Sequence, residues 1–128
     1  MTRLLLDTHT FLYALGDPSK LSRKVQRLLA DPSVERWVSA VSLWEIAIKV
    51  QIRKLDLPLD PNFYTIHLRS LKAAVLPVNL SHSLAMFSLP LHHRDPFDRL
   101  LIAQARSESL TLATRDAAIA QYDVPILW

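Results

Sequence analysis

The chain has 128 residues, of which half are hydrophobic and 21% are charged, and its formal net charge is +3. It contains no cysteine and a single glycine, which excludes disulfide frameworks, cysteine-based zinc sites and the glycine-rich loops that hold phosphates or dinucleotides. No apolar run approaches the ~18 residues of a membrane span, and the first leucines stop at Asp7, too soon for a signal peptide. We therefore expect one cytoplasmic domain over residues 1–128, away from membranes.

The first half of the chain predicts two strands that alternate with helices. The apolar run in "RLLLD", from Arg3 to Asp7, is typical of a strand buried on both faces of a parallel sheet. From Leu21, apolar residues recur at i, i+4, i+7 and i+8, the spacing of an amphipathic helix. The elements expected here are a strand at 3–7, a helix at 8–15, a helix at 21–29, a strand at 36–41 and a helix at 42–55.

Proline marks the helix starts in the second half. Asp60-Pro61 and Asp95-Pro96 each place a capping acid before a proline, which is favoured at the first helical position. The expected elements are helices at 61–71, 81–89 (capped by Ser81), 96–107 and 116–122, and strands at 73–78, 111–114 and 124–128, the last at the sheet edge because of its proline. This alternation predicts a three-layer α/β domain, a mostly parallel sheet of four to five strands with helices on both faces.

Four acids fall where the predicted strands pass into helices: Asp7, Glu45, Asp98 and Asp116. The carboxyl ends of parallel strands meet at one sheet edge, where ligands bind, so we expect these side chains to lie together. Clustered carboxylates repel unless a cation joins them, and oxygen ligands suit Mg²⁺ or Mn²⁺. Such an ion polarises a phosphoryl oxygen and activates water, so the chemistry indicated is hydrolysis of a phosphodiester.

Local roles at helix starts are the alternative for several of these acids. Ser42 and Glu45 have the spacing of a capping box, so Ser42 is expected as a helix cap. Asp95 is a good N-cap, and Asp98 in the first turn favours the helix dipole. Asp116 could cap the helix at 116–122. Asp7 has no such explanation, because an aspartate at the end of a buried strand has poor propensity and a desolvation cost.

The basic residues suit a polyanionic substrate. Without the four acids, fifteen basic residues face eight acidic ones, a net charge of +7. The candidate contacts to a nucleic-acid backbone are Arg94, Arg99 and Arg115, with Lys49, Arg53 and Lys54 further out. Arg99 and Arg115 could instead neutralise the neighbouring acids.

Other polar and aromatic residues are given supporting roles. Thr8 and Thr114 could donate hydrogen bonds that orient Asp7 and Asp116. The histidines near the acids are expected at the surface or behind the ligands. The three tryptophans could stack on bases, although packing in the core or in an interface is the preferred interpretation.

Four stretches together resemble a PIN domain, specifically a bacterial VapC-type toxin of a type II toxin–antitoxin pair: "LLLDTHTFLYAL", "SAVSLWEIAIK", "HHRDPFDRLLIAQA" and "LATRD". The acidic residues of the family match Asp7, Glu45, Asp98 and Asp116. The resemblance implies a Mg²⁺- or Mn²⁺-dependent ribonuclease, a homodimer, and inhibition by a small antitoxin whose C-terminal segment covers the active site. Asp95 is an additional acid in "RDPFD".

Two other functions stay open, a PIN-type RNA-processing nuclease that is not a toxin and a metal- or RNA-binding module without turnover. The complete set of four acids disfavours the module, and a small antitoxin gene immediately upstream would favour the toxin. Apolar residues on short helices, Trp44, Ile48, Ile52 and the "LAMFSL" stretch, indicate a homodimer. The antitoxin is expected to dock on the helices from Leu21 to Leu29 and from Leu43 to Leu55.

Overall fold

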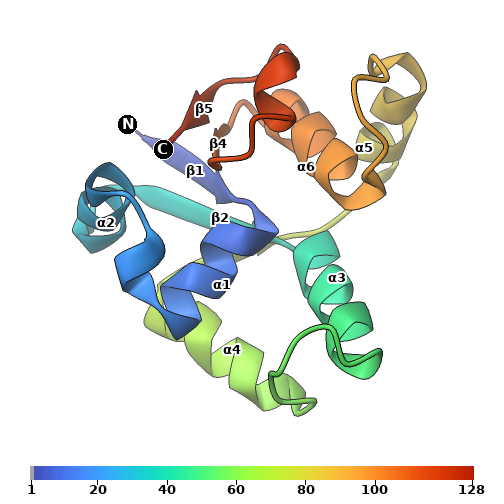
Figure 1. Ribbon diagram of the computed structural model, residues 1–128. Coiled ribbons are helices and arrows are strands. Elements are labelled where there is room, and N and C mark those ends of the chain that lie inside the picture. The colour runs from blue at the N-terminus through green and yellow to red at the C-terminus, as the bar shows by residue number, and fades with distance from the viewer. Residues whose placement is uncertain (1) are drawn as a thin grey trace.

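A computed structural model describes residues 2–128 and shows a five-stranded sheet (Figure 1). The strands are β1 (Arg3–Leu6), β2 (Glu35–Ser39), β3 (Ala74–Leu76), β4 (Thr111–Ala113) and β5 (Ile126–Leu127). All neighbours pair in parallel in the order β3-β2-β1-β4-β5, which puts β1 at the centre and β5 at an edge. The predicted parallel sheet is therefore confirmed, with the last strand at the edge as expected.

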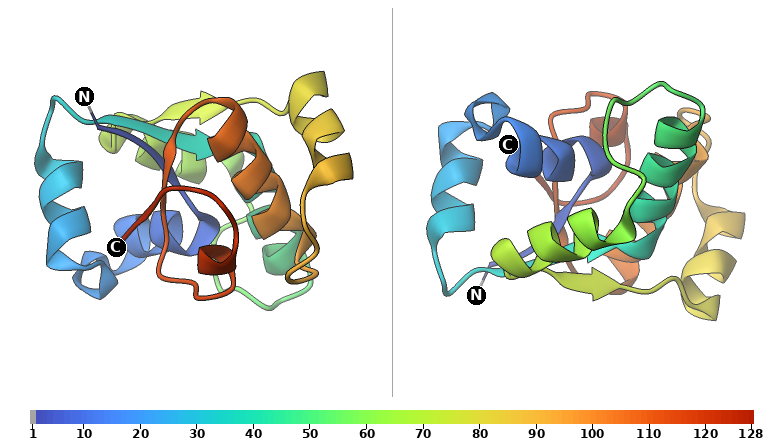
Figure 2. Two further views of the ribbon diagram at one scale, coloured as in Figure 1. Left: turned by 90° about the horizontal axis from the view of Figure 1, so that it is seen from above. Right: turned by 90° about the horizontal axis from the view of Figure 1, so that it is seen from below.

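Helices cover both faces of the sheet, also as predicted. They are α1 (Thr8–Gly16), α2 (Arg23–Ala30), α3 (Ala40–Gln51), α4 (Pro61–Ser70), α5 (Leu80–Ala85) and α6 (Pro96–Ser107), with 3₁₀ turns at Pro18–Lys20, Met86–Ser88 and Ile119–Gln121. Figure 2 shows the two faces of the sheet: α6 lies in front of the sheet in the view from above, and α4 lies in front of it in the view from below. No helix within residues 2–128 is long and apolar enough to cross a membrane.

The central strand divides the core into two halves. Leu5 packs in a cluster with Leu101 and Ile102 of α6, whereas Leu4 and Leu6 pack on the other face with residues of α1, α3 and α4. All three leucines of β1 are fully buried, as a continuous apolar run predicts for a central parallel strand. The strand that carries Asp7 is thus the best fixed element of the sheet.

The start of α3 differs from the prediction. The helix begins at Ala40 and its N-cap is Ser39, whose hydroxyl accepts a hydrogen bond from the Val41 backbone N–H at 3.1 Å. The predicted cap at Ser42, with its capping box to Glu45, was wrong, because two residues assigned to the strand belong to the first helical turn. Ser42 is instead fully buried inside that helix.

Two smaller boundaries also differ. The N-cap of α5 is Asn79 and not Ser81, because the Asn79 side chain accepts from the His82 backbone N–H and the His82 ring accepts from the Asn79 backbone N–H. The Ser81 hydroxyl donates to the Asn79 side chain. The helix predicted at 116–122 shortens to the single 3₁₀ turn Ile119–Gln121.

Candidate active site

Asp7 lies at the carboxyl end of β1 and is 4% exposed. It is also the N-cap of α1, because its Oδ1 accepts a hydrogen bond from the Thr10 backbone N–H at 2.8 Å. The expectation that Asp7 has no local role was therefore wrong. Its backbone N–H donates to the Ala113 carbonyl of β4 at 3.1 Å, which fixes the acid at the junction of the two central strands. Capping occupies one carboxylate oxygen and orients the side chain.

Glu45 projects from α3 into a closed polar corner. It is 3% exposed; its Oε1 accepts from the Thr8 hydroxyl at 2.7 Å, and its Oε2 forms an ion pair with Lys49 Nζ at 2.6 Å. Thr8 therefore supports Glu45 and not Asp7, and its hydroxyl also lies 3.0 Å from the Ser42 hydroxyl. Lys49 neutralises an acid here, whereas the sequence suggested a place further out for it.

The α6 start separates the two acids of the "RDPFD" stretch. Asp95 is the N-cap, and its Oδ1 accepts from the backbone N–H groups of Phe97 and Asp98 at 2.9 and 3.2 Å. The Asp98 side chain lies toward His93, with 3.4 Å between Asp98 Oδ2 and His93 Nε2. The other ring nitrogen of His93 is 2.9 Å from the Tyr122 hydroxyl, so the imidazole is held from behind.

The electrostatic surroundings of Asp98 are unusual for an aspartate. Burial, followed by the negative charge of Asp95, raises the pKa of Asp98 to about 6. Asp116 and Asp7 raise this pKa further, while the hydrogen bond with His93 lowers it. Asp98 is therefore the carboxylate at which negative charge gathers without a compensating cation.

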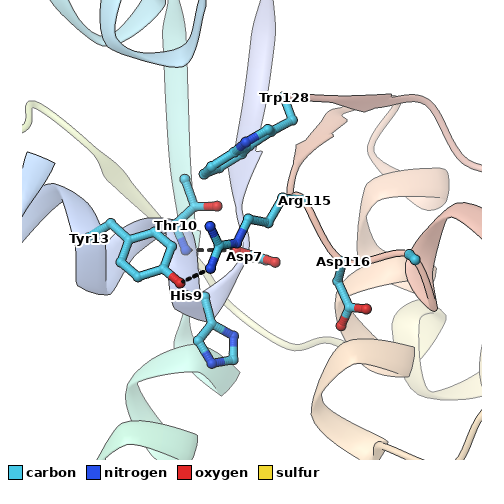
Figure 3. A pocket seen from close by; sticks show the side chains of 8 residues that line it. Asp7, His9, Thr10, Tyr13, Arg115, Asp116 and Trp128 are labelled. Carbon is cyan, nitrogen blue, oxygen red and sulfur yellow. Dashed lines mark hydrogen bonds between the residues drawn. The ribbon is translucent and has the colours of Figure 1, made fainter. Parts of the chain in front are cut away.

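Asp116 follows β4 and is exposed. Its Oδ1 accepts from the Ala118 backbone N–H at 2.9 Å, and its own N–H donates to the Thr114 hydroxyl at 3.1 Å, so Thr114 orients the backbone of Asp116 as an acceptor. Asp7 and Asp116 border one cavity of about 310 Å³ (Figure 3). The charges of both also act on Asp98, which lies outside the lining of that cavity.

The arrangement fits a hydrated cation. Asp7, Asp98 and Asp116 concentrate negative charge at one sheet edge, and their donors are all oxygens, the ligands that Mg²⁺ and Mn²⁺ prefer. Across residues 2–128, however, no three acidic or histidine side chains stand ready as a ligand set. Water molecules and a substrate phosphate would have to complete the coordination, as is usual for Mg²⁺. Glu45 differs from this group in that it pairs with a cation of the protein, Lys49.

Of the predicted basic contacts, only Arg115 borders the cavity. Arg99 donates to the Pro90 carbonyl at 2.8 Å and to the Tyr122 hydroxyl at 3.0 Å, so it holds the loop before α6. Arg94 is exposed. Among the described residues, neither Arg99 nor Arg115 forms an ion pair with an acid.

The sequence interpretation missed two contacts of the site. Lys49 on Glu45 has the i, i+4 spacing of a helical ion pair, which was a usable signal. Tyr13 lies beside Arg115, 102 residues away, and no local pattern predicts that contact. His93 contacts Asp98 from the loop before α6, which agrees with the expectation of a histidine behind a candidate ligand.

A parallel α/β sheet with carboxylates at the ends of its central strands defines the class of the chain. The family description "PIN domain" matches residues 4–125, and the chain belongs to the PIN domain family.

Several relatives share this architecture over nearly their whole length. The chain is 27% identical to ribonuclease VapC22 of Mycobacterium tuberculosis, over 98% of this chain and 95% of that protein. It resembles the crystal structure of VapBC2 from Rickettsia felis bound to a promoter DNA fragment, with a TM-score of 0.75, 16% identity and 98% coverage of both chains. VapC20 of Mycobacterium tuberculosis, described as a sarcin–ricin loop cleaving toxin, matches with a TM-score of 0.64 and 19% identity over 94% of this chain and 95% of that one.

Proposed function

We propose that this chain is a Mg²⁺- or Mn²⁺-dependent endoribonuclease that acts as the toxin of a toxin–antitoxin pair. The observation that carries the proposal is the uncompensated charge at Asp98, whose pKa burial and neighbouring acids raise to about 6. A domain that keeps such a group in the first turn of α6, where the charges of Asp7 and Asp116 act on it, is suited to hold a cation there. Membership of the PIN family and the similarity to a protein named ribonuclease VapC22 support the same reading.

Asp7, Asp98 and Asp116 are the residues that would hold the ion. When bound, Mg²⁺ or Mn²⁺ supplies a Lewis acid for the phosphoryl oxygen and lowers the pKa of a bound water. The capping bond from Thr10 holds Asp7 in place, and His93 supports Asp98 through Nε2. Glu45 is proposed to act from its place beside Lys49, as an outer carboxylate that faces bound water.

An apolar groove between α3 and α4 supports the antitoxin proposal. A cavity of about 380 Å³ there is lined mainly by apolar side chains, among them Leu43, Val50, Leu59, Tyr64 and Leu68. A second hollow of about 290 Å³ is lined in part by Leu21 and Leu29 of the α2 region. We propose that the antitoxin lays apolar residues on these surfaces. Co-expression with the product of a small upstream gene should yield a complex, and Leu59→Asp should weaken it.

The homodimer proposal is supported by a second set of apolar side chains. Trp44 is 62% exposed and Phe87 is 90% exposed, and Ile52, Leu80 and Leu84 are also exposed, whereas Ile48 is half-buried. An exposed set of this kind on one small domain is typical of an interaction surface. Light scattering at micromolar protein should give the mass of two chains; a mass of one chain would contradict the dimer.

One experiment tests the nuclease and separates the alternatives. The purified protein is incubated with total RNA in Mg²⁺, in Mn²⁺ and in EDTA, and the new RNA ends are mapped. We expect cleavage that needs the ion and is absent from Asp98→Asn purified in the same way. Cleavage that persists in EDTA would contradict the metal proposal. Binding of RNA without new ends would favour the module without turnover, and cleavage without growth arrest on expression would favour an RNA-processing enzyme.

A further inference from the structure

The cavity bordered by Asp7 and Asp116 is also lined by residues that have no role in the proposed ion site. These are the rings of His9, Tyr13 and Trp128 and the guanidinium of Arg115, with the smaller residues Thr10 and Ala117. Figure 3 shows the Arg115 guanidinium beside Tyr13, with Trp128 on one side of it and His9 on the other. The cavity of about 310 Å³ lies at the small end of the range for ligand pockets, which suits one nucleotide.

Arg115 is held in the cavity by Tyr13. Its Nη2 donates to the Tyr13 hydroxyl at 2.9 Å, and its Cζ lies 5.2 Å from the centre of the Tyr13 ring. Within residues 2–128 it forms no ion pair with Asp7 or Asp116, although it shares their cavity. Since a guanidinium has five N–H donors, most of them stay free for a ligand.

The positive charge of Arg115 gives the cavity a place for a phosphate. Asp7 and Asp116 repel an anion, so a phosphate that enters the cavity is attracted to the side where Arg115 lies. The planar guanidinium can donate two parallel N–H bonds to one phosphate group. Tyr13 is then a positioning residue, because its hydroxyl and ring fix the guanidinium in the cavity.

The remaining rings suit a base. The Tyr13 ring is flanked by cations, with Arg115 at 5.2 Å and Lys20 Nζ at 5.7 Å from its centre, so it is engaged already. His9 is exposed and Trp128 is half-buried in the same lining. Stacking of unpaired bases on such rings is the usual way in which proteins hold single-stranded RNA, and it tolerates every base.

We propose that this cavity binds one nucleotide of single-stranded RNA beside the phosphodiester that is cut, with Arg115 on the phosphate and with His9 and Trp128 against the base. The inference rests on the proposed ribonuclease function and adds the site that places the substrate. A chain that entered at this point would pass its next phosphate toward Asp7, Asp98 and Asp116. The aromatic wall then selects a flexible single strand over a stacked duplex.

Binding is tested apart from cleavage, in the Asp98→Asn background and in EDTA, with a ten-nucleotide single-stranded RNA and an abasic ribose-phosphate chain of the same length. Arg115→Met should weaken binding of both probes by about tenfold and lower the slope of log Kd against log salt by about 0.7, the loss of one phosphate contact on a single strand. Arg69→Met removes the same charge from the exposed end of α4 and is the matched control, expected to change Kd less than about twofold.

Separate variants test the stacking of the base on Trp128 and the positioning of Arg115 by Tyr13. Trp128→Leu should weaken binding of the RNA but not of the abasic chain, and leave the salt slope unchanged. Tyr13→Phe keeps the ring and removes the hydroxyl, so it should weaken binding in the wild-type Arg115 context and have no effect in Arg115→Met. Arg115→Lys retains the charge but loses the pair of parallel N–H donors of the guanidinium. The slope of log Kd against log salt should therefore stay that of the parent.

The outcomes separate this inference from the nuclease itself. If Arg115→Met and Trp128→Leu bind both probes like the parent while Asp98→Asn abolishes cleavage, the cavity inference is overturned and the nuclease stands. If the wild type cleaves nothing with any ion but Arg115→Met still weakens binding, the nucleotide site stands without the nuclease. Circular dichroism melting of each variant checks the fold, and a misfolded Arg115→Met leaves the decision to Arg115→Lys and Trp128→Leu.

Discussion

Two groups of residues at the carboxyl end of the sheet differ in whether a basic side chain pairs with the carboxylate. In the Glu45 corner, formed by Glu45, Thr8 and Lys49, the carboxylate is 3% exposed, but each oxygen has a close partner, at 2.7 and 2.6 Å. In the Asp98 corner, formed by Asp98 and His93 with Asp7, Asp95 and Asp116 nearby, no lysine or arginine pairs with an acid among the described residues.

The extent of burial alone does not identify the carboxylate that lacks a cation. The Asp98 side chain is 15% exposed and thus less buried than Glu45, but its burial and the like charges around it raise its pKa to about 6. A buried charge is tolerated where partners satisfy it, and it is costly where its neighbours carry the same sign. The Glu45 carboxylate is satisfied within the protein, whereas we propose that a bound ion would compensate the charge around Asp98.

The largest expected effect comes from removing the charge of Asp98. Asp98→Asn keeps the shape but not the charge, so metal-dependent RNA cleavage should fall more than about 100-fold, the upper end of the loss when only a residue that supports a ligand is changed. The measurement is the initial rate on a fixed RNA in excess Mg²⁺. A variant that cleaves like the wild type would remove Asp98 from the site.

The same substitution should stabilise the fold in a pH-dependent way. The pKa of Asp98 is raised in the folded state, so between about pH 4 and 6 the folded protein binds more protons than the unfolded chain, and stability falls as the pH rises through that window. Above pH 6 the cost is fully present, and Asp98→Asn should remove about 1 to 2 kcal/mol of it. Thermal melting in EDTA at pH 7.5 should show the gain, and melting at pH 3.5 should not.

Breaking the Glu45 corner should have the largest effect on stability. Lys49→Met leaves a buried carboxylate without its cation, which costs about 3 kcal/mol, the lower end for a broken buried pair because Lys49 is one-third exposed. Glu45→Gln in the same protein removes the orphaned charge and should restore most of the loss. Urea unfolding of the single and double variants measures both steps. Equal stability of Lys49→Met and the wild type would show that the ion pair contributes nothing.

Adding Mg²⁺ should stabilise the fold through the Asp98 corner and not through the Glu45 corner. Mg²⁺ at 100 times its Kd should stabilise the wild type by about 2.7 kcal/mol, and Asp98→Asn by much less. Protons compete with the ion for Asp98, so this stabilisation should weaken as the pH falls below about 6. Melting temperatures across a grid of pH and Mg²⁺ provide the measurement, with Lys49→Met as the control that should still respond to Mg²⁺.

The difference between the corners also marks the limit of what the sequence predicts. The strand order and the helices that start at Asp60-Pro61 and Asp95-Pro96 follow from apolar runs, proline and caps, which are local signals. The placement of acids at strand ends follows from parallel topology alone.

The partners of those acids could not be predicted in the same way. Thr8 was assigned to Asp7 because it is adjacent in sequence, but its hydroxyl reaches Glu45, 37 residues away. The cap of α3 was misplaced because "SAVS" offers two serines, and both are fully buried in the fold, so the sequence alone does not tell which one caps the helix. Which acid stays uncompensated depends on distances between elements, and these exist only in the fold.

The smallest expected effect separates Asp95 from Asp98 within one helix turn. Asp95→Ala removes the cap of α6 and should cost about 1 kcal/mol, partly offset because the charge that raises the pKa of Asp98 also disappears. Asp95→Asn is the matched control, since asparagine caps a helix as well as aspartate but carries no charge. It should leave the melting temperature near that of the wild type, lower the pKa of Asp98 as followed by carboxyl NMR, and keep the protein active. An Asp95→Asn variant with unchanged melting and no cleavage would instead place Asp95 itself on the ion.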